Sequence, residues 1–321
     1  GRGVSHATIL GTHGGRVSVW ARPGRLGRMA DMTVQREFAD QKLVIIGGGP
    51  GGYEAALVAA SLGADVTVVE EQGMGGSAVL TDVVPSKTLI ASADTMNRFA
   101  SARDLGVHVG DDLDATEELN NLRVDLDKVN VRLLRLAATQ SRDIKRGLER
   151  VGVRVVVGRG KIVDRYTVVV DPSDDEPYEL KADVVLVSVG AHPRELDTAK
   201  PDGERIFNWK QIYQLTEIPE KLIVVGSGVT GAEFAGAYLA LGARVTLVSS
   251  RDRVLPTVDA DAANLVEAGF RRRGMEVLSG ARAQAARVVG EGTEDERVEE
   301  RADAVGALGG RGHRVVDVPV G

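Results

Sequence analysis

The chain contains no cysteine among its 321 residues. It therefore has no disulfide, no thiolate zinc site and no thiol nucleophile, although this absence says nothing about its redox compartment. Aromatic residues make up only 4% of the sequence, so the apolar content, 43% in all, is mostly alanine, valine and leucine. No apolar run approaches the roughly 20 residues that span a bilayer. The net charge of -6 argues against a nucleic-acid partner or an anionic membrane surface.

Both ends of the chain differ in composition from the middle. The first 28 residues are rich in arginine and glycine and contain no acid, and the last 31 are first acidic and then rich in glycine and arginine. We predict a disordered or artefactual extension over residues 1–40, with a transit peptide as the weaker alternative. Residues 291–321 are predicted to form an irregular tail, and a solvated segment, a hairpin and a frame-shifted product all fit their composition.

Two segments between these ends repeat one plan of strand, glycine turn, helix and strand. The first, residues 42–70, begins with the apolar run Leu43–Ile46 and ends with a second predicted strand over Asp65–Glu70. Residues 221–249 repeat the arrangement. A continuous apolar run is typical of a parallel strand that is buried on both faces. The duplication predicts an α/β fold with two Rossmann-like dinucleotide-binding domains.

Each unit carries the pattern G-x-G-x-x-G between its first strand and its helix. The first glycine allows the tight turn, the second lets backbone N–H groups approach a pyrophosphate, and the third lets helix and strand pack closely. The N-terminus of the helix then favours the phosphate charge. The six glycines are Gly47, Gly49, Gly52, Gly226, Gly228 and Gly231.

The ends of the second strands distinguish the two predicted cofactor sites. Glu70 follows Gly52 at about the spacing expected of an acid that binds the adenosine ribose. The second unit ends instead in Ser249, with Arg251 two residues further on. A neutral residue with an arginine nearby permits a 2′-phosphate, so the sequence favours NADPH without excluding NADH.

The segments between the two units predict further helices and strands. Residues Asp125–Glu149 read as an amphipathic helix, with Val129, Leu133, Leu136 and Ile144 broadly on one side. Three valine-rich runs are predicted to be strands of a β-meander, namely Val153–Val157, Tyr166–Val170 and Val184–Val189. We interpret His192 as exposed or structural rather than as a base. No histidine cluster has metal-ligand spacing, so we predict no metal site.

These features together resemble the pyridine nucleotide–disulfide oxidoreductase family, which includes lipoamide dehydrogenase and glutathione reductase. The resemblance covers about residues 41–288 and depends on both glycine patterns, on Glu70, and on the segments that read GG…PSK, VSVGAHP and GxGxxGxE. It implies an FAD-binding domain over residues 41–192 and an NAD(P)-binding domain over residues 193–290. The cofactor-binding residues that it implies are Gly47, Gly49, Pro50, Gly52, Glu70, Gly76, Ser77, Lys87, Gly190, Gly226, Gly228, Gly231, Glu233, Ser249 and Arg251.

The family pattern GGTCxNxGCxPSK, which holds a redox-active disulfide, aligns with GGSAVLTDVVPSK here. Ala78 and Val83 occupy the two cysteine positions, and Asp82 replaces a glycine. Because a dithiol relay requires thiolates, disulfide-reductase chemistry by the usual route is implausible. The segment is similar to that of the cysteine-lacking NAD(P)H:quinone reductases of the family. This similarity implies that electrons pass from NAD(P)H to the flavin and then directly to a quinone-like acceptor.

The resemblance also implies two catalytic residues. Lys87 is expected near the reactive edge of the flavin, where its charge would favour the reduced state, and Glu233 is expected to pair with it. An exposed lysine and an unrelated glutamate remain the alternative.

The last part of the chain departs from the family. Full-length members return to complete the FAD domain and then add an interface domain through which they form homodimers, and neither element is recognisable here. We expect a C-terminally truncated or frame-shifted product, located in the cytoplasm, whose oligomeric state is open. A non-catalytic fragment that keeps the nucleotide-binding folds is the alternative function, and a dihydrolipoamide dehydrogenase is a more distant one.

Overall fold

The computed structural model describes residues 8–10, 16–18, 38–39, 41–107, 122–172, 175–193, 195–288 and 314–320. They form two compact units that interleave along the sequence. One unit draws on the chain up to Met74 and on Asp143–Val189, and the other draws on Gly75–Arg142 and on the chain from Gly190 onward. The predicted domains 41–192 and 193–290 follow one another along the chain instead, and their boundaries remain a prediction.

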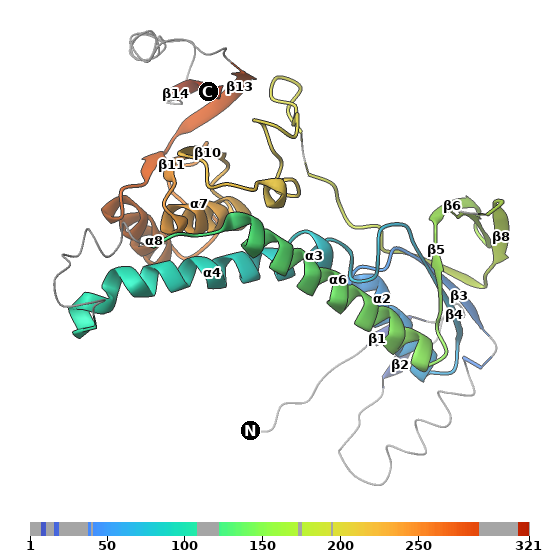
Figure 1. Cartoon of the computed structure of the whole chain (residues 1–321). Coiled ribbons are helices and arrows are strands. Elements are labelled where there is room, and N and C mark those ends of the chain that lie inside the picture. Colours follow the sequence, from blue (N-terminus) through green and yellow to red (C-terminus); the bar gives the residue numbers. More distant parts are fainter. Residues whose placement is uncertain are drawn as a thin grey trace. The chain divides into compact units, whose positions relative to one another are not determined.

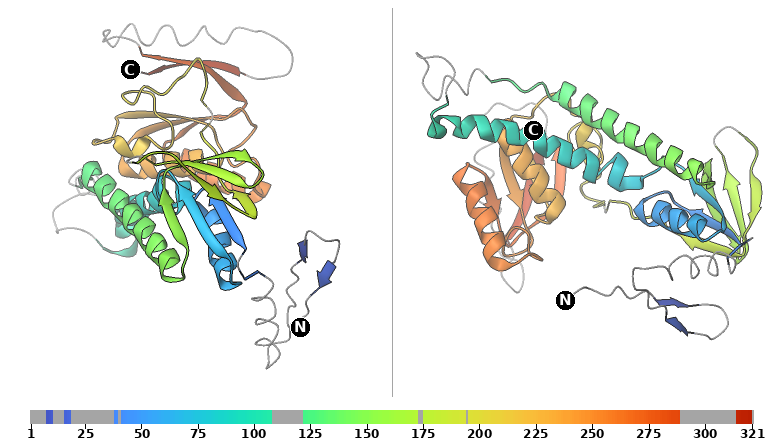
Figure 2. Two further views of the ribbon diagram at one scale, coloured as in Figure 1. Left: turned by 90° about the vertical axis from the view of Figure 1, so that its right-hand side faces the viewer. Right: turned by 90° about the horizontal axis from the view of Figure 1, so that it is seen from below.

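The first unit is built on a four-stranded parallel sheet in the order β5-β4-β3-β9. Alternate residues of β3 and β4 face opposite sides, as the pleat of a strand requires. Ile45 and Val68 pack with helix α2, whereas Val44 and Val69 pack with the three-stranded meander β6-β7-β8. Figure 2 shows the ribbons of α2, in blue, and of the meander, in yellow-green. The elements are β3 Lys42–Ile46, α2 Pro50–Ser61, β4 Asp65–Glu70, β5 Arg154–Val157, β6 Arg159–Asp164, β7 Thr167–Asp171, β8 Tyr178–Lys181 and β9 Val184–Val187.

This sheet corrects the assignment of two predicted meander strands. The runs at Val153–Val157 and Val184–Val189 contribute β5 and β9, which pair in parallel with β4 and β3. Only the run at Tyr166–Val170 supplies a meander strand, β7. Short valine-rich runs fit either kind of strand, and the partner that decides between them lies far away in sequence.

The second unit contains a three-stranded parallel sheet in the order β10-β11-β12. Helix α7 packs on this sheet and also against helix α4 (Figure 1). Its elements include α3 Gly76–Leu80, α4 Val83–Ala102, η1 Arg103–Leu105, η2 Ile212–Gln214, β10 Lys221–Val225, α7 Val229–Leu241, β11 Arg244–Val248, α8 Ala260–Arg272 and β12 Glu276–Leu278.

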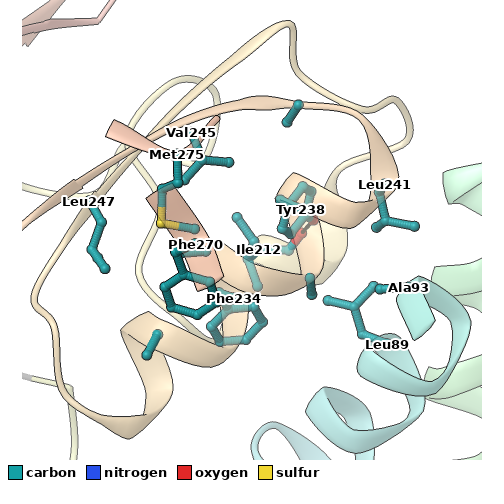
Figure 3. Packing of buried hydrophobic residues seen from close by; sticks show 14 of the residues in the cluster. Leu89, Ala93, Ile212, Phe234, Tyr238, Leu241, Val245, Leu247, Phe270 and Met275 are labelled. Atoms are coloured by element: carbon teal, nitrogen blue, oxygen red, sulfur yellow. Dashed lines mark hydrogen bonds between the residues drawn. The ribbon is translucent and has the colours of Figure 1, made fainter. Parts of the chain in front are cut away.

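The chain has few aromatic residues, and several of them lie in the core of the second unit. Leu89 and Ala93 of α4 point towards α7, where Tyr238 is fully buried (Figure 3). The ring of Phe270 on α8 lies close to α7, because a Cβ added at Gly236 would be 3.0 Å from its Cε1 atom. Small residues on α7 therefore let the neighbouring helices approach closely.

Helix α6, Leu126–Arg150, agrees with the predicted extent of 125–149. Its buried stripe differs from the prediction at one position. Leu133 is buried as expected, but Leu136 is 40% exposed, and Ala137 takes the inward position beside it. Among the described residues, no helix is long and apolar enough to cross a membrane.

The outer segments form two small strand pairs. Strands β1 Thr8–Leu10 and β2 Arg16–Ser18 are antiparallel. Strand β14, Arg314–Val320, pairs in parallel with β13, Ala281–Val288. The prediction of an irregular tail did not anticipate β14, and most of residues 1–40 and 291–321 lies outside the described residues.

Candidate functional site

The first glycine turn is shaped by steric demands that only glycine meets. Gly47 has φ 101°, and its N–H donates to the Val69 carbonyl oxygen at 2.8 Å. A Cβ there would lie 2.2 Å from the Ser188 carbonyl oxygen, and a Cβ at Gly52 would lie 1.9 Å from the Gly47 carbonyl oxygen. The turn therefore holds β3, α2 and the end of β9 close together, as the predicted roles of these glycines require.

The start of helix α2 leaves its first turn open to an anion. Gly49 is the N-cap and has no side chain to cap the helix, and Pro50, the first helical residue, has no N–H to satisfy. The Gly52 N–H donates to the Gly49 carbonyl oxygen at 2.9 Å, and the helix dipole favours a negative charge at this point. Both predicted residues thus lie at a helix end that favours a negative charge.

Glu70 lies at the carboxyl end of β4, beside this turn. Its Oε2 atom accepts a hydrogen bond from the Gly48 N–H at 2.6 Å, and its Oε1 atom accepts from the N–H groups of Gln72 at 2.6 Å and Gly73 at 3.2 Å. A carboxylate has about four acceptor positions, so one remains for a ribose hydroxyl. Glu70 thereby organises the glycine turn, a contact that the spacing alone did not predict.

The second glycine turn repeats this geometry. Gly226 has φ 111° and donates its N–H to the Val248 carbonyl oxygen at 2.9 Å. A Cβ at Gly231 would lie 1.8 Å from the Gly226 carbonyl oxygen. Gly228 is the N-cap of α7 and has open space around its Cβ position, which leaves room for a ligand to approach the backbone.

The loop that follows β11 is arranged differently from the end of β4. Ser249 is fully buried, and its hydroxyl lies 2.6 Å from the hydroxyl of Ser227. The Ser249 oxygen also accepts from the Arg251 N–H at 3.1 Å. The side chain of Arg251 is exposed. Of the two predicted residues, Arg251 is open to solvent, whereas the Ser249 hydroxyl is engaged within the loop itself.

Lys87 and Glu233 meet in the second unit, as the family resemblance implied. The Lys87 Nζ atom lies 2.5 Å from the Glu233 Oε1 atom and joins α4 to α7 across 146 positions of sequence. The Lys87 side chain is 55% exposed and the Glu233 side chain 26%. An ion pair this open contributes at most about 1 kcal/mol to stability. The pair places the lysine charge beside α7, where it is accessible to solvent.

The segment that aligns with the family's redox motif forms the short helix α3 and the first turn of α4. Gly75, with φ 95°, is the N-cap of α3, Gly76 is its first residue, and the Ser77 carbonyl oxygen accepts from the Asp82 N–H at 2.7 Å. Ala78 is half-buried and Val83 is 47% exposed. Neither side chain offers a group that can exchange electrons with a bound cofactor.

Tyr213 is a buried polar residue that the sequence did not single out. It belongs to η2, and its ring centroid lies 5.8 Å from that of Phe234, the neighbour of Glu233 on α7. Its hydroxyl is buried and has no hydrogen-bond partner among the described residues. Burial raises the pKa of this phenol, and the negative charge of Asp82 raises it further. No sequence motif marks such a residue.

The remaining predicted positions are open to solvent. Gly190 has φ 67° and, like His192, is exposed, which agrees with the interpretation of His192 as an exposed loop residue. Among the described residues, no group of three or more His, Asp or Glu side chains is placed to hold a metal ion.

The model of the family described as pyridine nucleotide-disulphide oxidoreductase matches residues 41–314. The chain belongs to this family. The resemblance inferred from its motifs is therefore confirmed, and so is the predicted α/β fold with two Rossmann-like domains. Membership also supports the expected cofactors, FAD together with NADH or NADPH.

Two curated relatives illustrate the range of the family. An NAD(P)H dehydrogenase (quinone) of Mycobacterium tuberculosis is 46% identical over 260 residues, which are 78% of this chain and 51% of that protein. A dihydrolipoyl dehydrogenase of Zymomonas mobilis is 31% identical over 239 residues, which are 74% of this chain and 49% of that protein. The chain thus spans about half the length of these relatives.

Solved structures agree with this relationship. LpdA from Mycobacterium tuberculosis superposes with a TM-score of 0.69 and 46% identity, over 76% of this chain and 52% of that one. The flavoprotein disulfide reductase RclA from Escherichia coli superposes with a TM-score of 0.62 over 76% of this chain and 50% of that one, at 20% identity, which shows a shared fold.

Proposed function

We propose that the protein is an FAD-dependent oxidoreductase that takes hydride from NAD(P)H and passes electrons from the flavin directly to a quinone-like acceptor. The observation that carries this proposal is the exposed ion pair of Lys87 and Glu233 in a chain without cysteine. The M. tuberculosis relative named NAD(P)H dehydrogenase (quinone) supports the choice of acceptor.

The residues of the first unit fit FAD. A Cβ at Gly47 or Gly52 would collide with a backbone carbonyl oxygen, so the tight turn depends on glycine, and no side chain caps the start of α2, where the helix dipole favours a pyrophosphate. Glu70 keeps one acceptor position for the ribose. Bound flavin would supply reversible two-electron chemistry, and the protein would supply position and electrostatics.

Lys87 would act by its charge and Glu233 by holding that charge in place. A fixed cation stabilises negative charge that develops beside it, so Lys87 favours the electron-rich state of a neighbouring group. The 2.5 Å contact with Glu233 directs the lysine charge towards α7. Ala78 and Val83, in contrast, can contribute only small apolar surface, which suits a flat apolar acceptor better than a disulfide.

Three steps test this function on the purified full chain. Bound or reconstituted flavin is first detected by its visible absorption. NADPH and NADH are then added without oxygen to bleach it, and a quinone or lipoamide is added to restore it. We expect bleaching by a nicotinamide nucleotide and rapid reoxidation by the quinone, with no turnover of lipoamide. Reoxidation by lipoamide instead of the quinone would contradict the proposed acceptor.

Replacement of Lys87 by methionine tests the role of the ion pair. Lys87→Met keeps the length of the side chain and removes its charge, so flavin reduction should slow by about tenfold or more. Lys128→Met is the matched control, because Lys128 forms an exposed pair with Asp125 at 2.8 Å. An unchanged reduction rate in flavin-loaded Lys87→Met would refute the role of the charge.

A second candidate is a chain that keeps both nucleotide-binding folds but does not turn over. A colourless protein that binds nicotinamide nucleotides yet cannot be reconstituted with FAD would identify this case.

A further inference from the structure

We propose that Ser227 is a positioning residue for the nicotinamide dinucleotide: it clamps both ends of the loop 249–255 so that Arg251 meets a 2′-phosphate. This inference rests on the proposed function to the extent that the second unit must bind NAD(P)H. Position 227 is the variable residue inside the pattern Gly226-x-Gly228, so phosphate binding itself places no demand on a serine there.

The near end of the loop is held by the Ser227 hydroxyl. Ser227 and Ser249 are 5% and 0% exposed, and their hydroxyl oxygens lie 2.6 Å apart. A hydroxyl has one proton and two acceptor positions. Ser249 accepts from the Arg251 N–H at 3.1 Å, and its contacts to Ser227 and to the Arg251 carbonyl oxygen at 3.1 Å use the rest. Nothing on Ser249 remains for a ribose.

The far end of the loop is held by the Ser227 backbone. The carbonyl oxygen of Ser227 accepts from the Leu255 N–H at 2.8 Å. Leu255 has φ 52°, the only non-glycine residue with positive φ among the described residues, and a left-handed leucine is strained by roughly 1–2 kcal/mol. A strained residue persists only when its surroundings fix it, and Ser227 supplies part of that constraint.

This clamp leaves Arg251 with a fixed backbone and a free side chain. Its N–H donates to Ser249, and its carbonyl oxygen accepts from the Gly280 N–H at 2.7 Å. Its guanidinium is exposed and forms no ion pair with a carboxylate in the described part of the chain. A planar guanidinium matches a phosphate in two hydrogen bonds, so a positioned, unpaired arginine is suited to an added phosphate group.

Two buried hydrogen-bond donors without a partner lie beyond the carboxyl ends of β11 and β12. The Arg253 Nε atom and the Ser279 Oγ atom are buried without a hydrogen-bond partner in the part of the chain that the structure describes. The segment after Ser279 runs beside the loop, because the Ala281 N–H donates to the Ser249 carbonyl oxygen at 2.8 Å. A bound water or an acceptor on a ligand would satisfy such donors.

The loop carries one acid, Asp252, whose side chain is 83% exposed and whose Oδ2 atom lies 4.0 Å from Arg253 Nη1. At the position where an acid would select NAD, the chain has the buried, fully bonded Ser249. The balance of charge and placement therefore favours the phosphorylated dinucleotide.

Binding of adenosine 2′,5′-bisphosphate and of 5′-AMP to the full chain, measured by calorimetry, tests the proposal without flavin and without turnover. We expect the wild type to bind the bisphosphate at least about tenfold more tightly than AMP. Ser227→Ala and Ser249→Ala should each weaken bisphosphate binding by about tenfold, the worth of a well-placed hydrogen bond, and change AMP binding by less than about twofold. The double variant should lose no more than either single variant, because the two hydroxyls act as one unit.

Two further variants complete the design. Ser250→Ala removes an exposed neighbouring hydroxyl and should leave both affinities unchanged. Arg251→Gln alters only an exposed side chain, cannot be dismissed as a folding defect, and should remove the preference for the bisphosphate. Equal losses for both nucleotides, additive losses in the double variant, or a preference that survives in Arg251→Gln would each overturn the proposal. A failure of quinone reduction would leave these affinities unaffected, so the two proposals fail separately.

Discussion

The glycine turns of the two units have a similar geometry, but the units differ where the second strand ends. In each pattern the third glycine packs against the carbonyl oxygen of the first. A Cβ added at Gly52 would lie 1.9 Å from that oxygen, and a Cβ added at Gly231 would lie 1.8 Å from it. At the end of the second strand, Glu70 turns its carboxylate back onto the glycine turn. Ser249 turns its hydroxyl into its own loop. The same glycine turn is therefore combined with a different side chain at the end of the second strand in each unit.

The units also differ in what surrounds the first glycine and in their cores. A Cβ at Gly47 would meet the chain after β9, whereas a Cβ at Gly226 would meet nothing within 4 Å. The buried core around Ile45 and α2 is aliphatic, whereas the core of the second unit also contains buried aromatic residues, among them Tyr238 and Phe270. These differences make the same substitution in the two units a direct comparison.

The largest loss of stability is expected from substitution of the third glycine, which is equally crowded in both units. Gly52→Ala and Gly231→Ala each force a Cβ into a backbone carbonyl oxygen, so each should cost about 3 kcal/mol or more of the free energy of unfolding of its unit. Gly228→Ala is the control, because open space surrounds its Cβ position, and it should weaken nucleotide binding without a loss of stability. Denaturant titrations of the three variants measure this. A stable Gly231→Ala protein would show that the packing of α7 is looser than described.

Substitution of the first glycine should destabilise the two units to different extents. Gly47→Ala combines a left-handed backbone with a contact of 2.2 Å to the Ser188 carbonyl oxygen, whereas Gly226→Ala carries only the backbone term, about 1–2 kcal/mol. We expect Gly47→Ala to lower the denaturant midpoint clearly more than Gly226→Ala. Equal shifts would mean that the end of β9 can move away from the first turn.

A moderate effect is expected from Glu70, which has no counterpart in the second unit. Glu70→Gln weakens three hydrogen bonds from backbone N–H groups to a charged acceptor, so stability should fall by about 2 kcal/mol and FAD should bind less tightly. Glu71→Gln, at the exposed neighbouring position, is the matched control and should change neither quantity. If both variants behave alike, the carboxylate of Glu70 does not organise the turn.

The sequence predicted the parts of this molecule that depend on neighbouring residues. The glycine spacing and the apolar runs located both turns and the bounds of β4, because close packing of turn, helix and strand needs glycine at fixed offsets. Strand β9 was misassigned because its pairing depends on Leu43, some 140 positions away. Ser227 and Tyr213 were missed because a single hydroxyl has no pattern, and its role follows only from what folds around it.

The smallest change in stability at neutral pH is expected from substitution of the buried tyrosines that distinguish the core of the second unit. Burial raises the pKa of both Tyr213 and Tyr238, so the folded state keeps these phenols neutral after they ionise in the unfolded chain. Above about pH 10 the unfolded state binds fewer protons, and the free energy of unfolding should fall by about 1.4 kcal/mol per pH unit for each tyrosine.

Phenylalanine variants show how much each tyrosine contributes to the fall in the free energy of unfolding at alkaline pH. Tyr213→Phe should cost nothing or stabilise slightly at pH 7, because its hydroxyl has no partner among the described residues. Tyr238→Phe loses a weak bond of 3.5 Å to the Ile212 carbonyl oxygen and should cost less than about 1 kcal/mol. Each variant should remove one tyrosine's share of the slope, and the double variant should remove both. A slope that survives in the double variant would place the alkaline sensitivity elsewhere and weaken the contrast between the two cores.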